Sequence, residues 1–100
     1  MFIHHVFFWL KDPGSRADLD SLKEGLQRLS RVGTIRSFHI GRPAGTHRDV
    51  IDGSYALSWF TTFDSAEDEA AYQQDPIHLE FVSTCSHLWS KVVVYDTVDA

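Results

Sequence analysis

Aromatic side chains are unusually frequent in this chain: seven Phe, three Tyr and three Trp make up 13% of its 100 residues. A single domain of this length buries only about two-thirds of the surface that its unfolded chain exposes, so a monomer has little room for thirteen large rings. Some rings must therefore line a pocket, or a second subunit must cover them. The length allows one domain, at residues 1–100, because a second core would not fit.

Charge and cysteine content exclude several classes of protein. Nine Lys and Arg against fourteen Asp and Glu give a formal net charge of −5, and no basic cluster offers a surface to nucleic acid or an anionic membrane. No apolar run approaches the ~20 residues that cross a bilayer, and the first residues do not resemble a signal peptide. The single cysteine, Cys85, fits a reducing compartment. We therefore predict a cytoplasmic protein without nucleic-acid or membrane partners.

Hydrophobic periodicity predicts alternating strands and helices. Four strands are expected, at residues 2–10, 34–40, within 51–63 and at 89–98. Apolar spacings of three and four predict one helix from Ser15 to Gly33, and a second begins at Ser65. Asp75 and Pro76 interrupt the second helix and restart it as N-cap and first residue. Gly25 disfavours the first helix by ~1 kcal/mol, which indicates close packing there, in the simplest arrangement against the sheet.

The order of these elements is β-α-β-β-α-β, which predicts an α+β, ferredoxin-like fold with a four-stranded antiparallel sheet. In the third strand, alternation places one set of side chains on a common face: Tyr55, Leu57, Trp59, Thr61 and Phe63. A single layer of two helices covers only one face of such a sheet. The other face would remain an apolar patch too large for a monomer, so we expect two copies to pair.

Four blocks of sequence, in this order, carry a family resemblance. They are His4–Lys11, Gly41–Thr46, Tyr72–His78 and Trp89–Asp96. Together they resemble the stress-responsive A/B barrel family, called Dabb. The resemblance implies a dimeric α+β barrel in which two four-stranded sheets face each other. It implies no single activity, because a few plant members are polyketide cyclases and relatives with the same barrel include cofactor-free monooxygenases and haem-handling proteins.

Tyr72 and His78 are the strongest candidates for chemistry. The resemblance to the plant cyclases implies that a Tyr and a His at this spacing, around the helix break, transfer protons. An aldol-type cyclisation needs a base that removes a proton beside a carbonyl, for which His78 is suited, and a donor that stabilises the enolate, for which Tyr72 is suited. The pair could equally line a ligand pocket without catalysis, or serve the geometry of the helix break. A functional pair requires a cavity that touches both side chains.

His4 is the third candidate, because its spacing to Lys11 matches the first-strand histidine of the family. On an extended strand it shares a face with Val6 and Phe8, where a buried imidazole needs a hydrogen-bond partner. It could orient a substrate or relay protons with His78. The alternative is a core or interface histidine whose hydrogen bonds are satisfied.

The remaining polar clusters predict no cofactor and no metal. His4 and His5 are adjacent and point to opposite faces of a strand, and no His-Glu-x-x-His motif occurs. The loop from Gly41 to Arg48 carries cationic side chains and two glycines, but it lacks the spacing of a phosphate loop and no helix follows it. We expect that loop to be solvated or to lie at the rim of a dimer, and Cys85 to be a small buried hydrophobe.

Two classes of function remain open at this level. The first is a small-molecule protein with an aromatic pocket whose polar points are His78, Tyr72 and His4. As an enzyme it would catalyse cofactor-independent proton transfer on a ketide-like or phenolic compound. The second is a non-catalytic, stress-associated homo-oligomer, and a cofactor-free monooxygenase of the same barrel type is a further alternative. The expected partners are a second copy of the chain and a small-molecule ligand.

Overall fold

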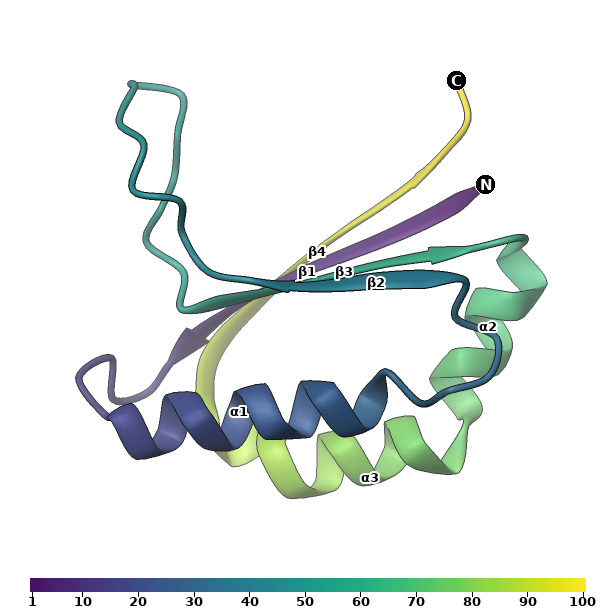
Figure 1. Cartoon of the computed structure of the whole chain (residues 1–100), viewed down its shortest axis with the longest axis horizontal. Coiled ribbons are helices and arrows are strands. Elements are labelled where there is room, and N and C mark those ends of the chain that lie inside the picture. The colour runs from purple at the N-terminus through teal and green to yellow at the C-terminus, as the bar shows by residue number, and fades with distance from the viewer.

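One antiparallel sheet and a single layer of helices make up the computed structural model, which describes residues 1–100. The elements are β1 (Phe2–Leu10), α1 (Arg16–Leu29), β2 (Ser37–Gly41), β3 (Leu57–Phe63), α2 (Ala66–Gln74), α3 (Pro76–Cys85), the 3₁₀ turn η1 (Ser86–Leu88) and β4 (Trp89–Val98). The strand order is β2-β3-β1-β4, with every neighbouring pair antiparallel. Figure 1 shows α1 and α3 beneath the sheet and α2 at one end of it. The predicted ferredoxin-like fold is confirmed.

Local side-chain chemistry sets each helix start where the sequence predicts it. Ser15 and Ser65 each accept a hydrogen bond from the backbone N–H three residues later, at 3.1 and 3.2 Å. Asp75 accepts from the backbone N–H of Ile77 at 2.8 Å, and Pro76 is the first residue of α3. The break between α2 and α3 is therefore built from the two residues that predict it. No helix combines the length and apolar character needed to cross a bilayer.

Element boundaries depart from the sequence prediction where the chain enters turns. Helix α1 ends at Leu29, and irregular turns carry the chain through Gly33 to β2, which begins at Ser37. Strand β3 lies within the predicted range 51–63, but it begins only at Leu57, so residues 51–56 precede the regular ladder. Periodicity alone overextends these elements, because apolar residues in the turns continue the pattern.

Tyr55 lies on the other face of the sheet from the one predicted. Its ring packs 4.9 Å from the ring of Phe7 and 6.3 Å from that of Trp9, whereas Leu57 and Trp59 are buried beneath the sheet. The prediction fails because strict alternation holds only within a regular strand, and Tyr55 precedes the start of β3.

Gly25 permits a close contact between two helices rather than between a helix and the sheet. A Cβ atom at this position would lie 2.5 Å from the Sγ atom of Cys85 and 3.3 Å from the ring of Phe81, both on α3. The expected neighbour was wrong, and the expected close packing is present. Cys85 itself is buried, as predicted.

The two faces of the sheet differ in burial. The closed face packs against the helices, and together they form a core of fourteen buried hydrophobic residues: Val6, Phe8, Leu10, Leu22, Leu26, Leu29, Val32, Leu57, Trp59, Phe63, Tyr72, Phe81, Cys85 and Leu88. The open face carries side chains that no second layer covers: Ile3, His5, Phe7, Trp9, His39, Phe60, Val93 and Tyr95. Tyr95 is 62% exposed. The loop between β2 and β3 rises on this uncovered side (Figure 1).

Candidate functional site

A cavity of about 160 Å³ lies between the closed face of the sheet and the helices. Most of its lining is apolar and comes from strands β1, β3 and β4 and from helices α1 and α3: Val6, Phe8, Leu29, Trp59, Phe81, Val82, Trp89, Val92 and Val94. The polar lining includes His4, Tyr72 and His78, the three residues nominated from the sequence. An apolar cavity of ~150 Å³ accommodates benzene, so this one has room for a group of about that size.

The helix break brings Tyr72 and His78 together. Tyr72 lies near the end of α2, and His78 lies in the first turn of α3. Their ring centroids are 4.8 Å apart, edge to face, and the ring of His4 lies 5.7 Å from that of Tyr72 on its other side. The tyrosine is thus flanked by two imidazoles, one from a strand and one from a helix.

The hydroxyl of Tyr72 accepts a hydrogen bond from Nε1 of Trp59 at 3.0 Å. Burial raises the pKa of Tyr72 above its ordinary value, an effect larger than the opposite influence of the Trp59 hydrogen bond. Glu69 adds to the increase through its negative charge. Tyr72 therefore stays protonated across the physiological range and keeps an O–H that it can donate.

Burial also determines the protonation state of His78. It lowers the pKa of His78 below the ordinary value of 6.5, and repulsion from the nearby His4 ring, when that ring is protonated, lowers it further. The backbone of Gln73 and the carboxylates of Glu69 and Asp75 oppose this shift. The Nδ1 atom of His78 is buried and has no partner in hydrogen-bonding geometry. At neutral pH the ring is therefore an unprotonated base that bonds to no other side chain.

His4 is buried and has the hydrogen-bond partner that its position requires. Its Nδ1 atom lies 2.6 Å from Oδ1 of Asp96, which faces it across the β1–β4 pair. Since a carboxylate only accepts, Nδ1 carries the proton and Nε2 is left with the lone pair. The His4 side chain is 8% exposed and that of Asp96 is 46% exposed, so the hydrogen-bonded pair reaches from the cavity to the edge of the sheet.

Sequence reasoning missed Asp96 and the role of Trp59. Asp96 is the only acidic residue within β4, and it alternates with Val92 and Val94 on the closed side of the sheet. An isolated carboxylate at an inward position of an apolar strand is a signal that calls for a buried partner. The bond from Trp59 to Tyr72 had no comparable signal, because it depends on how α2 docks on β3.

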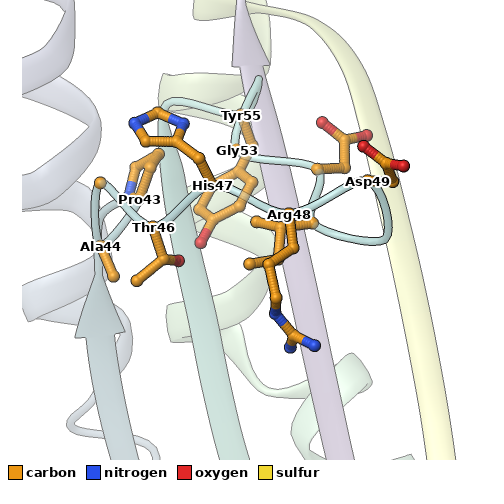
Figure 2. Close-up of a pocket in the computed structure, with 11 residues that line it drawn as sticks. Pro43, Ala44, Thr46, His47, Arg48, Asp49, Gly53 and Tyr55 are labelled. Atoms are coloured by element: carbon orange, nitrogen blue, oxygen red, sulfur yellow. The ribbon is translucent and has the colours of Figure 1, made fainter.

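The largest hollow of the molecule lies elsewhere, in the loop between β2 and β3. It measures about 590 Å³ and is enclosed by residues 43–55. His47, Arg48 and Asp49 are all exposed, and the guanidinium of Arg48 extends away from the neighbouring carboxylates (Figure 2). Water reaches each of these charges, so the loop lacks the desolvated, convergent groups of a specific anion site. The smaller cavity is therefore the better candidate.

Metal-ligating side chains do not gather anywhere in the chain. No group of three or more His, Cys, Asp and Glu residues lies close enough to hold an ion. The cavity has two histidines, and the carboxylate next to one of them already accepts its Nδ1–H. This donor set does not match a zinc site, which needs three or four protein ligands.

These features define a ferredoxin-like α+β domain with an apolar cavity, lined by histidine and tyrosine, between its sheet and its helices. The chain belongs to the stress responsive A/B barrel domain family, Dabb, whose family model matches residues 2–99. The resemblance carried by the four sequence blocks is thereby confirmed.

Individual relatives agree with this assignment. A stress-response A/B barrel domain-containing protein of Arabidopsis thaliana is 27% identical over 79 residues, covering 78% of this chain and 70% of the relative. The structure of a hydroxynitrile lyase from Passiflora edulis has a TM-score of 0.81 at 23% identity, covering 99% of this chain and 93% of the lyase. A dimeric ferredoxin-like protein of unknown function from Thermobifida fusca has a TM-score of 0.79 at 16% identity, covering 96% and 88%. At such identities the structural similarities establish the fold.

Proposed function

We propose that this protein is a homodimeric, cofactor-independent enzyme that transfers protons on a small apolar or aromatic carbonyl compound, as a polyketide cyclase does. The observation that carries the proposal is the cavity of about 160 Å³ on which His4, Tyr72 and His78 converge. Its apolar walls favour a hydrophobic ligand, and the three polar groups supply the directional contacts that fix a ligand's orientation.

His78 is the base of the proposed reaction. Its lowered pKa keeps it unprotonated at neutral pH, so it can accept a proton from a carbon beside a carbonyl. The C–H bond breaks, the N–H bond forms, and the electron pair of the C–H bond moves onto the carbonyl oxygen as an enolate. The enolate carbon then attacks a second carbonyl or takes the proton back.

Tyr72 is the donor that stabilises the enolate oxygen. Its raised pKa keeps the phenol protonated, and the apolar surroundings strengthen a hydrogen bond to a developing oxyanion. His4, held through Nδ1 by Asp96, presents its Nε2 lone pair to the same cavity. We assign His4 the orientation of the substrate, for example through a hydroxyl group that donates to Nε2.

The open face supports the homodimer in this proposal. Its aromatic side chains include Tyr95, which is 62% exposed, and Phe60, which packs against His5. A contiguous apolar patch of this kind is expected to be covered in water, and a second copy offers the same patch. The Thermobifida fusca neighbour is described as dimeric. The absence of any basic cluster and the single cysteine support a cytoplasmic protein that binds no nucleic acid.

Hydrogen–deuterium exchange tests the proposal without knowledge of the natural substrate. Acetophenone, a single-ring methyl ketone, is incubated with the protein in D₂O, and exchange of its methyl protons is followed by NMR. We expect the protein to accelerate the exchange, and His78→Gln and Tyr72→Phe each to lower the rate about 100-fold or more, because each removes a general acid–base group.

Matched variants control for nonspecific effects of substitution. His87→Gln alters an exposed histidine of η1, and Tyr95→Phe alters a tyrosine of the open face. Both variants should retain the full exchange rate. An unchanged rate in His78→Gln would contradict its assignment as the base, and no acceleration by the unmodified protein would contradict the proposed activity.

A further inference from the structure

Trp59 is the largest fully buried side chain of the protein, 1% exposed, and it lies in the wall of the cavity. It is on β3, opposite Val6 of β1, with its indole directed toward the helices. An indole N–H donates and cannot accept, so burial is tolerated only when an acceptor is within reach. The acceptor is the hydroxyl of Tyr72, 3.0 Å away on α2.

This hydrogen bond restricts where the hydrogen of Tyr72 can point. A phenol oxygen has one O–H and accepts through its lone pairs. Because the Trp59 N–H approaches the oxygen, the Tyr72 O–H must point away from the indole. No other side chain or backbone group accepts from Tyr72, and the cavity is the remaining space that its side chain contacts.

The indole also limits the volume of the site. Trp59 closes the cavity on the β3 side, and the remaining space of about 160 Å³ is close to the ~150 Å³ that accommodates a benzene molecule in an apolar cavity. A second fused ring has no space toward β3, and it would extend toward solvent past Val82 and Val94, which are 41% and 45% exposed. Trp89 lines the same cavity from β4, packing against Phe8 and Phe81, and it makes no hydrogen bond to Tyr72.

We propose that Trp59 is a positioning and specificity-determining residue of this site: it directs the Tyr72 O–H into the cavity and restricts the buried part of the substrate to a single six-membered ring bearing a carbonyl. The inference rests on the proposed function, because the donor and the carbonyl are its elements. It adds the size class of the substrate and a role for a residue that touches the donor.

The test compares two Trp→Phe substitutions in one cavity. The binding of acetophenone and of the two-ring analogue 2-acetonaphthone is measured by titration calorimetry, and the ¹³Cζ resonance of Tyr72 is assigned by its loss in Tyr72→Phe. The unmodified protein should bind the one-ring ketone more tightly than the two-ring ketone, whose second ring the cavity does not bury. Trp59→Phe should shift the Tyr72 resonance and weaken acetophenone binding about two- to tenfold, the effect of one neutral hydrogen bond.

Trp89→Phe is the control, and it should leave the Tyr72 resonance in place because Trp89 does not touch the hydroxyl. Trp59→Val, which removes most of the indole volume, should raise the affinity for 2-acetonaphthone about tenfold relative to the unmodified protein. Where Trp59→Val fails to fold, Trp59→Phe still tests the hydrogen bond through the tyrosine resonance.

The failures of the two proposals are distinguishable. Equal binding of both ketones by the unmodified protein, or identical Tyr72 resonances in Trp59→Phe and the parent, would overturn the role of Trp59 and leave the proton-transfer proposal standing. If neither ketone binds the unmodified protein, both the size class and the proposed carbonyl substrate are wrong.

Discussion

Both faces of the sheet carry aromatic and histidine side chains, but helices of the same chain cover only the closed face. On the closed face, two of the three polar groups at the cavity have specific partners: His4 bonds to Asp96, and Tyr72 accepts from Trp59. On the open face, His5 packs 4.3 Å from Phe7 and makes no hydrogen bond. Polar groups that converge on an apolar cavity are typical of a ligand-binding or catalytic site, whereas uncovered aromatic rings are typical of a protein–protein interface. The sheet thus separates the candidate site from the face that we propose pairs with a second copy.

The most severe test of this comparison uses two neighbours on β1 that point to opposite faces. Phe8 is 3% exposed in the core, and Phe7 lies on the open face. Phe8→Glu should abolish folding, because the free-energy cost of burying an unpaired carboxylate exceeds the total free energy of unfolding of a small domain. Phe7→Glu should give a folded monomer, with a mass near 11.4 kDa instead of twice that value. Far-UV circular dichroism and light scattering measure the two outcomes.

A dimer that survives Phe7→Glu would show that the open face is not the contact between subunits. Arg31→Glu, at an exposed position after α1, is the control for charge reversal outside both faces. It should change neither the secondary structure nor the mass.

A smaller effect is expected where the helix layer is packed most closely. Gly25→Ala would place a methyl group 2.5 Å from the Sγ atom of Cys85. We expect it to lower the free energy of unfolding by up to about 2 kcal/mol, the difference between an overpacking cost of about 1–3 kcal/mol and the ~1 kcal/mol that alanine gains in helix propensity. Denaturation in urea measures the change. Gly33→Ala, where no atom lies within 4 Å, is the control and should change stability by about 0.5 kcal/mol at most.

The smallest expected effect is a loss of stability at low pH. Its dependence on protein concentration should differ between a histidine on the closed face and one on the open face. Burial lowers the pKa of both His5 and His78 below 6.5. The unfolded chain therefore binds protons at a higher pH than the folded chain, and stability present above about pH 6.5 is lost as the pH falls below it.

Substitution by glutamine should distinguish the two histidines. His78→Gln should reduce this loss equally at all protein concentrations, because the closed face belongs to one chain. His5→Gln should reduce acid-induced dissociation, an effect that weakens as the protein concentration rises. Urea midpoints at two pH values and two concentrations measure both effects. Identical concentration dependence in the two variants would contradict the assignment of the faces.

Much of the fold could be predicted because its signals are local. Ser65 and the pair Asp75–Pro76 specify helix starts through their own backbone and side-chain chemistry, and β4 occupies the range that its apolar run predicts. The uncovered face of the sheet could also be predicted, because a single layer of helices covers only one face. The face of Tyr55 could not be predicted, because one irregular residue before β3 reverses the alternation.

The site was predictable in its residues and not in its geometry. His4, Tyr72 and His78 carry a family pattern, but the partner of His4 lies 92 residues away on β4, and only the register of the β1–β4 pair brings it opposite. The bond from Trp59 to Tyr72 likewise depends on the docking of α2 against β3. Both are tertiary contacts without a spacing in the sequence that would indicate them.

The pairing of β1 with β4 also has a consequence for how the protein is made. Phe2 pairs with Val98, so two strands from opposite ends of this domain's sequence are neighbours in the sheet. During synthesis, β1, the most apolar strand, therefore has one edge unpaired until β4 has left the ribosome. The His4–Asp96 pair forms only then, which makes the candidate site one of the last parts of the domain to assemble.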